Sequence, residues 1–187
     1  MNLAIIGPSG SGKGTQAKLI ASRYGLKHIS TGTLLREEMK KNSPLASKIA
    51  SYVDRGRWVP SAIIMTILKA KLTQNFILDG TPRYLVQCFL LDRLLGSKGQ
   101  KFNAVISLTI TKEELRRRRR LYGDQFQTNR SDSGKKIFWA RWESGRKTLG
   151  AIVNYYRARG LLLEVDGNRP PKAIFADISH HLDKINT

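Results

Sequence analysis

The stretch Gly7-Pro8-Ser9-Gly10-Ser11-Gly12-Lys13-Gly14-Thr15 directly follows the apolar run Leu3-Ala4-Ile5-Ile6. An apolar strand that leads into a glycine-rich loop and then into a helix is the setting of a phosphate-binding loop. In such a loop, successive backbone N–H groups turn inward around an anion, and the helix N-terminus and a lysine add positive charge. We therefore expect Lys13 and the amides around it to bind the phosphates of a nucleotide.

One position departs from the general form of this motif. A Ser or Thr that binds magnesium usually follows the lysine, whereas this chain has Gly14 there and Thr15 one residue later. The alternative interpretation is a tight turn that binds no ligand. The strand predicted before the loop and the helix predicted after it argue against that alternative.

Length and charge set further limits. A chain of 187 residues accommodates one α/β domain with a sizeable core and small insertions, so we expect a single domain over residues 1–187. The 33 Lys and Arg residues outnumber the 14 Asp and Glu residues and give a formal charge of +19. This surplus favours polyanionic partners, and nucleic acid, acidic lipid and nucleotides all remain candidates.

The cysteine count and the apolar runs exclude several classes of protein. A single cysteine, Cys88, supports neither an internal disulfide framework nor a cysteine-rich zinc site, and its apolar neighbours predict a small core residue. No run approaches the roughly 20 apolar residues of a membrane span, and the N-terminus lacks a secretion signal. We expect a cytoplasmic protein without a membrane partner.

Apolar, strand-like runs alternate with helical stretches, which is typical of a parallel sheet wrapped by helices. We predict an α/β fold in three layers, with a five-stranded parallel sheet and helices on both faces. Short helical pieces are expected within residues 30–58, and residues 122–136 are predicted to form a polar, mobile flap. The predicted strands span residues 2–6, 27–29, 75–78, 104–110 and 161–165, and the predicted helices span residues 13–24, 61–72, 84–95, 112–121 and 136–159, before a C-terminal helix.

Asp79 ends one of the predicted buried strands and precedes Gly80. In open α/β sheets, ligands bind at the carboxyl ends of the strands, so this carboxylate is placed where it could face the phosphate loop. The alternative is an aspartate that only supports a turn before the glycine.

Taken together, the motifs resemble those of the nucleoside monophosphate kinases, and of their adenylate kinase branch most closely, over nearly the whole chain. The loop from Gly7 to Gln16 has that family's Gly-Thr pair after the lysine. Further similar segments follow in the family's order: Ile29-Ser30-Thr31-Gly32 with Leu35-Arg36, Gly56-Arg57-Trp58-Val59-Pro60 with Trp58 in place of Leu, Asp79-Gly80-Thr81-Pro82-Arg83 with Thr81 in place of Phe, Gln87, Arg130-Ser131-Asp132 with Ser133 in place of a second Asp, Arg141, and Asp166 to Pro170.

The resemblance implies ATP-dependent phosphorylation of a nucleoside monophosphate with Mg²⁺. Such a transfer depends mainly on positioning and on electrostatic stabilisation of the transferred group. The catalytic residues implied are Lys13, Asp79, Arg83, Arg130 and Arg141, with no direct metal ligand and with Asp79 acting through water. The ATP-binding residues implied are Gly10, Ser11, Gly12, Lys13, Gly14, Thr15, Arg118 and Arg169. The acceptor-site residues implied are Thr31, Arg36, Arg57, Val59, Gly80, Arg83 and Gln87.

The resemblance also implies two mobile parts. Residues 30–59 would form the insertion that binds the monophosphate, and residues 121–136 would form a short lid over ATP. Because this lid contains no cysteine, it should lack structural zinc. Closure over both substrates before chemistry would keep water from the donor phosphates.

The arginine run from Arg116 to Arg120 leaves the adenine contact open. Counting forward from Thr111 puts Arg118 at the family's adenine-stacking position, whereas counting back from Arg130 selects Arg120. A helix spreads such a run over all its faces, so a solvated basic face accounts for about three of the five.

Thr33 is a further departure, because the family usually has Asp at this position. The change puts the turnover rate in question more than the fold.

Thr31 and Gln87 favour AMP as the acceptor, because a glutamine amide presents both a donor and an acceptor to a purine edge. The reaction would then convert ATP and AMP into two ADP. A UMP/CMP-type kinase is one alternative. A nucleic-acid-binding P-loop ATPase is another, since it accounts for the +19 charge but leaves the acceptor motifs unused. As a kinase, the protein is expected to be a monomer, with incidental nucleic-acid binding through the arginine run.

Overall fold

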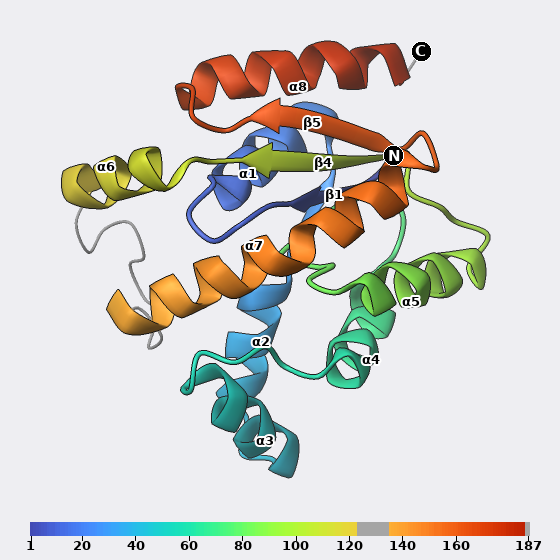
Figure 1. Ribbon diagram of the computed structural model, residues 1–187. Helices are drawn as coiled ribbons and strands as arrows, with labels where there is room; N and C mark the ends of the chain where they lie inside the picture. The colour runs from blue at the N-terminus through green and yellow to red at the C-terminus, as the bar shows by residue number, and fades with distance from the viewer. Residues whose placement is uncertain (123–134, 186–187) are drawn as a thin grey trace.

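A parallel sheet forms the centre of the computed structural model, which describes residues 1–122 and 135–185 (Figure 1). Within these residues the sheet has five strands in the order β2-β3-β1-β4-β5, and each neighbouring pair is parallel. The strands are β1 (Asn2–Ile6), β2 (Lys27–Ser30), β3 (Phe76–Asp79), β4 (Ala104–Thr109) and β5 (Leu162–Asp166). The predicted α/β fold with a five-stranded parallel sheet is confirmed.

Helices connect the strands and cover both faces of the sheet (Figure 1). The predicted boundaries differ from the observed ones by at most two residues. The region expected to hold short helical pieces contains two helices and no strand. The helices are α1 (Lys13–Tyr24), α2 (Thr31–Met39), α3 (Pro44–Val53), α4 (Ser61–Lys71), α5 (Leu85–Gly96), α6 (Lys112–Tyr122), α7 (Lys135–Arg157) and α8 (Pro171–Ile185).

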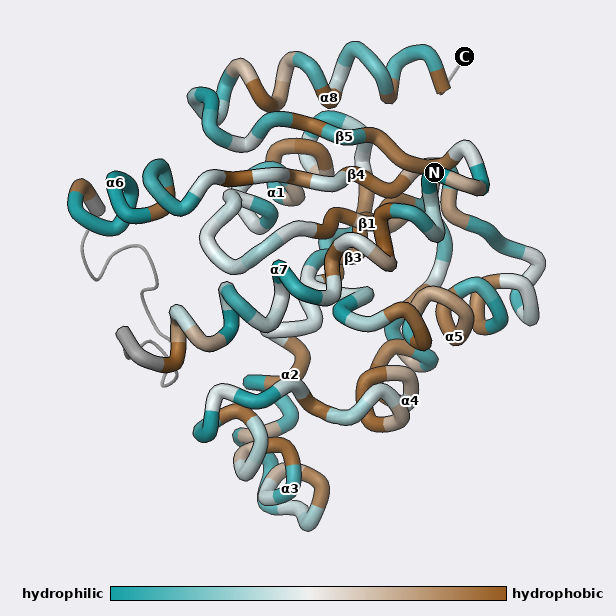
Figure 2. The backbone as a smooth tube through the Cα atoms, viewed as in Figure 1, coloured by the Kyte–Doolittle hydropathy of each residue, from teal (hydrophilic) through white to brown (hydrophobic). Residues whose placement is uncertain are grey.

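The central strand β1 divides the core into two layers. Side chains alternate between the faces of a strand, so Leu3 and Ile5 pack with α1 and α8, whereas Ala4 and Ile6 pack with α4, α5 and α7. All five residues of β1 are buried, as expected for a strand covered on both faces, and the strand is strongly apolar in Figure 2. This burial fixes the start of the phosphate loop at the end of the most protected strand.

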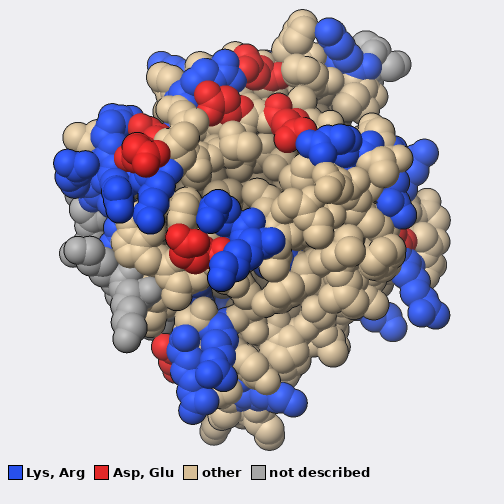
Figure 3. Space-filling view, in the orientation of Figure 1, with Lys and Arg blue, Asp and Glu red and all other residues tan. Residues whose placement is uncertain are grey.

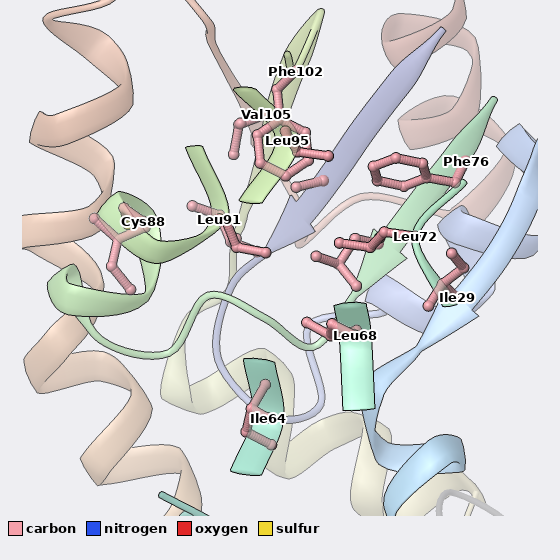
Figure 4. Packing of buried hydrophobic residues seen from close by; sticks show 14 of the residues in the cluster. Ile29, Ile64, Leu68, Leu72, Phe76, Cys88, Leu91, Leu95, Phe102 and Val105 are labelled. Atoms are coloured by element: carbon pink, nitrogen blue, oxygen red, sulfur yellow. The ribbon is translucent and has the colours of Figure 1, made fainter. Parts of the chain in front are cut away.

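The larger layer of the core lies between the sheet and α4, α5 and α7. Figure 4 shows Leu68, Leu72 and Leu91 among the side chains of this layer. The Phe76 ring, at the start of β3, meets the Phe102 ring edge to face, with 6.2 Å between the ring centroids. Cys88 is fully buried in this layer, which confirms the predicted core role, and burial raises the pKa of its thiol to about 12. The thiol is therefore protonated at neutral pH.

Helix α6 packs against α7 through a separate small cluster. Leu115 of α6 is buried with Phe138 and Trp142 of α7, and Trp139 packs against them.

No helix in the two described ranges combines the length and the apolar composition needed to cross a membrane. Of the predicted lid, residues 123–134 lie outside the described part of the chain.

Candidate active site

One cleft at the carboxyl ends of the strands is lined by every predicted site residue that the structure describes. Its volume is about 1570 Å³. A pocket for one drug-sized ligand occupies roughly 300–1,000 Å³, so this cleft has room for two nucleotides. Arg130 lies outside the described residues. The predicted residues that line the cleft are Gly10, Ser11, Gly12, Lys13, Gly14, Thr15, Thr31, Arg36, Arg57, Val59, Asp79, Gly80, Arg83, Gln87, Arg118, Arg141 and Arg169.

The phosphate loop joins β1 to α1 and is held closely against the sheet. A Cβ on Gly7 would lie 2.5 Å from the carbonyl oxygen of Leu108 in β4, and Gly7 has a φ of 140°, so only glycine fits there. Lys13 is 93% buried by its own loop and neighbours, since its exposed fraction is 7%. Its Nζ donates a hydrogen bond of 2.8 Å to the carbonyl oxygen of Pro8. The lysine charge is therefore already positioned over the loop.

The carboxylate of Asp79 lies beside the start of α1, as predicted from its place at the end of β3. A Cβ on Gly14 would be 3.5 Å from Asp79 Oδ2, so a glycine at this position leaves the carboxylate open toward the loop. The Nε2 atom of His28, from the neighbouring strand β2, lies 3.5 Å from the same oxygen. Burial opposes ionisation of Asp79, but the His28 imidazole and the charges of Lys13 and Arg83 outweigh it and hold the pKa of this carboxyl below its usual range.

Arginines from different elements converge in the cleft close to the phosphate loop. Arg83 donates from Nε to the carbonyl oxygen of Gly80 at 2.7 Å and from Nη1 to that of Gly7 at 3.4 Å. Arg36 of α2 donates from Nη2 to the hydroxyl of Thr33 at 2.9 Å. The threonine that replaces the family's usual aspartate thus contacts one of the predicted phosphate-binding arginines.

Trp58 links two of these arginines, a role that sequence reasoning missed. The guanidinium carbons of Arg83 and Arg141 lie 4.6 Å and 5.8 Å from the Trp58 ring, and the indole N–H donates to the Ser144 hydroxyl at 2.9 Å. Trp58, in the segment before α4, is therefore hydrogen-bonded to α7. The substitution of Trp for the family's Leu was the available signal, but the partners lie far away in the sequence.

Gln87 is almost fully buried at the start of α5 rather than exposed on it. Its Oε1 accepts a hydrogen bond of 2.6 Å from the Arg83 backbone N–H, and its Nε2 donates to the Ser61 hydroxyl at 3.1 Å. The hydroxyls of Thr31 and Thr81 lie 2.9 Å apart and are also buried. The Thr that replaces the family's Phe is therefore paired with a predicted acceptor-site residue.

The arginine run divides between two sides of α6. Arg118 lines the cleft, whereas Arg120 lines a different hollow. Arg118 donates to the carbonyl oxygens of Gly167 at 2.5 Å and Arg169 at 3.4 Å, in the loop between β5 and α8. Of the two ways of counting, the one forward from Thr111 selected Arg118, and Arg118 is the arginine that lines the cleft.

Glu114 orients the arginines that face the cleft. Its carboxylate accepts from Arg117 Nε at 2.6 Å and from Arg118 Nε at 2.7 Å. Hydrogen bonds from these two guanidinium groups lower the pKa of Glu114 to about 2. Arg118 is thus held in one orientation by an anion that stays ionised at neutral pH.

A family model described as adenylate kinase matches residues 5–161, which include the phosphate loop, Asp79 and Arg141. The chain belongs to the adenylate kinase family. This assignment agrees with a cleft that is lined by a phosphate loop and by several arginines. Membership of the family confirms the resemblance predicted from the motifs.

Curated members of the adenylate kinase family are similar to this chain over most of its length. The adenylate kinase of Archaeoglobus fulgidus is 33% identical over 217 aligned residues, which cover 100% of both chains. That of Thermus thermophilus is 37% identical and covers 92% of each chain, and that of Clavibacter michiganensis is 39% identical over 88% of this chain and 84% of its own. The likeness therefore extends over the whole cleft.

Within residues 1–122 and 135–185, no group of three or more His, Cys, Asp and Glu side chains is arranged to hold a metal ion. Of the described residues that line the cleft, two are acidic, Glu37 and Asp79. The cleft is thus mainly cationic, which suits ligands with several negative charges.

Proposed function

We propose that this adenylate kinase family member transfers the γ-phosphoryl group of ATP to AMP and yields two ADP. The observation that carries the proposal is a cleft of about 1570 Å³ that is lined by both the phosphate loop and the arginines Arg36, Arg83 and Arg141. In the transfer, an ionised oxygen of AMP bonds to the γ-phosphorus while the bond from that phosphorus to the β-phosphate oxygen breaks. Because the acceptor oxygen is already ionised at neutral pH, the reaction needs no general base.

The donor half of the site would consist of the phosphate loop and the face of α6 that carries Arg118. Lys13 and the loop amides bind the β and γ phosphates, and Thr15 contacts the α phosphate. Arg118 and the loop that contains Arg169 form a platform for the adenine, which stacks on the planar guanidinium group. Mg²⁺ bound to the ATP phosphates supplies charge neutralisation, and the ionised carboxylate of Asp79 orients its water ligands.

The acceptor half would be built around Arg36 and Arg83, whose planar forks suit phosphate oxygens. Arg57, Val59, Thr31 and Gly80 line the place where the AMP nucleoside would lie. These residues belong to the proposed acceptor insertion, residues 30–59, and to the end of β3. Arg141, and Arg130 from the proposed lid of residues 121–136, stabilise negative charge on the transferred group.

The choice of AMP would rest on Thr31 and Gln87. The Gln87 amide is already held by the Arg83 N–H and the Ser61 hydroxyl, so its orientation is fixed before a nucleotide arrives. A fixed amide discriminates between bases better than a freely rotating one, because less entropy is lost when it binds. Gln87→Ala should therefore reduce the preference for AMP over CMP.

The deciding experiment measures ADP formation from ATP with AMP, CMP, UMP, GMP or dTMP in turn. AMP should give the highest kcat/KM, and Lys13→Ala should reduce turnover by orders of magnitude while the protein remains folded by circular dichroism. Faster turnover of UMP or CMP than of AMP would favour a pyrimidine monophosphate kinase. ATP hydrolysis that requires RNA, with no ADP formed from AMP, would favour a nucleic-acid-binding ATPase.

The proposed enzyme is a monomer of the cytoplasm without structural zinc. A monomer suffices because the described residues bring the donor and acceptor halves together within one chain. Sedimentation at assay concentration tests this assembly state, and metal analysis of the purified protein tests the zinc prediction.

A further inference from the structure

A second hollow, which we call the α6 pocket, lies between α6 and α7 and has a volume of about 730 Å³. Among the described residues, it shares no lining residue with the nucleotide cleft. Of the six described side chains that line it, four are cationic, one is a tryptophan and one is acidic. They are Lys112, Arg116, Arg119, Arg120, Trp139 and Glu143.

The cations of the α6 pocket differ from the arginines that face the cleft. Arg117 and Arg118 are both paired with Glu114, at 2.6 Å and 2.7 Å. Among the described residues, neither Arg116 nor Arg120 has an acidic side chain within ion-pair distance. In this part of the chain the pocket therefore has four cationic side chains against the one carboxylate of Glu143, and it shares none of them with the nucleotide cleft.

Trp139 lines this pocket, and two buried aromatic rings support it from behind. Trp139 lies edge to face with Phe138 at 5.5 Å and with Trp142 at 5.7 Å, which holds its plane in place. The Lys112 ammonium lies 6.0 Å from the Trp139 ring, and the Arg119 guanidinium carbon lies 4.3 Å from the Phe138 ring. Cations and a fixed aromatic plane thus line the same hollow.

The surface charge extends this pattern beyond the pocket. Figure 3 shows Lys and Arg side chains gathered over α6, and the whole chain carries a formal charge of +19. Proteins that bind single-stranded nucleic acid combine a cationic groove for the backbone with aromatic rings on which bases stack. An acidic lipid surface would use the charge but has no base to place against Trp139.

We propose that the α6 pocket binds single-stranded RNA, with Lys112, Arg116 and Arg119 on phosphates and a base stacked on Trp139. The site is independent of the nucleotide cleft, so RNA and the kinase substrates bind at the same time. Each phosphate neutralised on a single strand contributes about −0.7 to the slope of log K against log salt concentration. Three such contacts predict a slope of about −2 from this pocket.

The test measures binding of a fluorescein-labelled oligouridylate of about 12 nucleotides by anisotropy, since such site sizes are typical. KCl is varied from about 50 to about 200 mM. The triple variant Lys112→Gln, Arg116→Gln, Arg119→Gln should weaken binding at low salt by more than about tenfold and make the slope shallower by about 2. Trp139→Leu should weaken binding by at least about fivefold and leave the slope unchanged.

A matched control removes the same charge elsewhere. Lys48, Arg93 and Lys101 are exposed and line neither hollow, so the triple glutamine variant at these positions should bind RNA nearly as well as wild type. Lys13→Ala should also leave RNA binding intact. Equal losses in the two triple variants, or loss of RNA binding in Lys13→Ala, would overturn the proposal, because the charge would then act non-specifically or the RNA would occupy the cleft.

Two further readouts separate this inference from the proposed kinase reaction. ADP formation by the Lys112, Arg116, Arg119 triple variant should match wild type, which also shows that the variant is folded. Vesicles with acidic lipid should not compete with the oligonucleotide. Competition by such vesicles, with the same loss of vesicle binding in the triple variant, would identify a lipid surface instead and refute the RNA site.

Discussion

At the scale of single residues, the candidate site depends on side chains whose partners are themselves held in place. Trp58 contacts the guanidinium groups of both Arg83 and Arg141, and Ser144 accepts a hydrogen bond from its indole N–H. An aromatic face attracts a cation without neutralising it. Trp58 can therefore help to orient the two arginines without itself cancelling their charge.

Replacement of Trp58 by Leu, the residue usual in the family, should impair use of AMP. Each lost cation–π contact is worth about 1 kcal/mol, so kcat/KM for AMP should fall roughly fivefold to thirtyfold. The KM for ATP should change little, because Lys13 and the phosphate loop are untouched. Steady-state kinetics with each substrate varied in turn measures both effects.

Trp58→Phe and Ser144→Ala serve as the controls. Phe keeps an aromatic face for the arginines and should restore much of the lost kcat/KM, whereas Ser144→Ala removes only the acceptor of the indole N–H. An equal loss for ATP and AMP in Trp58→Leu would point to a general packing defect and contradict the positioning role.

At the scale of elements, the loop between β5 and α8 connects the sheet to the proposed adenine platform. The N–H of Gly167 donates to the carbonyl oxygen of Thr109 at 3.0 Å, and its own carbonyl oxygen accepts from Arg118. A Cβ on Gly167 would lie 2.3 Å from the Thr109 carbonyl oxygen and 3.3 Å from that of Ser11. The end of β4, the phosphate loop and α6 thus all meet at this one glycine.

Gly167→Ala should destabilise the protein and weaken ATP binding together. Because the clash is with backbone atoms, the free energy of unfolding should fall by about 1–3 kcal/mol, as for an overpacked core site. The KM for ATP should rise, since Arg118 donates to the carbonyl oxygen of the displaced residue. Urea unfolding and ATP-dependent kinetics provide the two measurements.

The same substitution at Gly150, in the interior of α7, is the matched control. An added Cβ there meets no atom within 4 Å. Alanine favours a helix interior over glycine by about 0.5–1 kcal/mol, so Gly150→Ala should stabilise the protein. Similar unfolding curves for the two variants would show that the close approach at Gly167 is not tight.

At the scale of the whole molecule, two apolar layers hold the sheet while the surface carries a large excess of positive charge. The 14 Asp and Glu residues offset only part of the 33 Lys and Arg charges at neutral pH. Protonation of these carboxylates in acid leaves the cations uncompensated, and self-repulsion then opposes the compact state. Asp79 and Glu114 have lowered pKa values in the folded protein. Protonation of these two carboxyl groups therefore reduces the free energy of unfolding directly.

Stability should therefore fall as the pH decreases below the usual range of carboxyl groups. A carboxyl whose pKa is lowered by folding stabilises the native state above its unfolded pKa and loses that contribution as the pH falls through its folded pKa. For Glu114 this window runs from 4.5, its ordinary value, down to about 2. Thermal unfolding midpoints measured across this range test the prediction.

Glu114→Gln separates the contribution of Glu114 from the loss of stability that all the carboxyl groups cause when they are protonated in acid. Each ion pair of such exposure contributes up to about 1 kcal/mol, so the variant should be less stable than wild type at pH 7. The two unfolding midpoints should converge as the pH falls through about 2, because Glu114 then becomes protonated in the folded wild type as well. A gap that stays constant over this pH range would mean that the ion pairs with Arg117 and Arg118 do not stabilise the fold.

The order and type of the elements and the position of the phosphate loop could be predicted from the amino-acid sequence. These features are local: apolar periodicity defines each strand and helix, and Gly7 to Lys13 follow a buried strand directly. The sequence also placed Asp79 beside the loop, because the carboxyl ends of parallel strands share one edge of a sheet. Family membership could be predicted for the same reason, since the motifs are short and occur in a fixed order.

The partners that these residues meet became clear from the packing of the layers. This packing brings Trp58 close to both Arg83 and Arg141, places His28 3.5 Å from Asp79, and puts Arg118 and Arg120 on different sides of α6. A run of five arginines has no pattern from which a facing direction can be predicted, because every face of the helix carries the same residue. Contacts between residues distant in the sequence depend on how the layers pack, and local sequence patterns do not encode that packing.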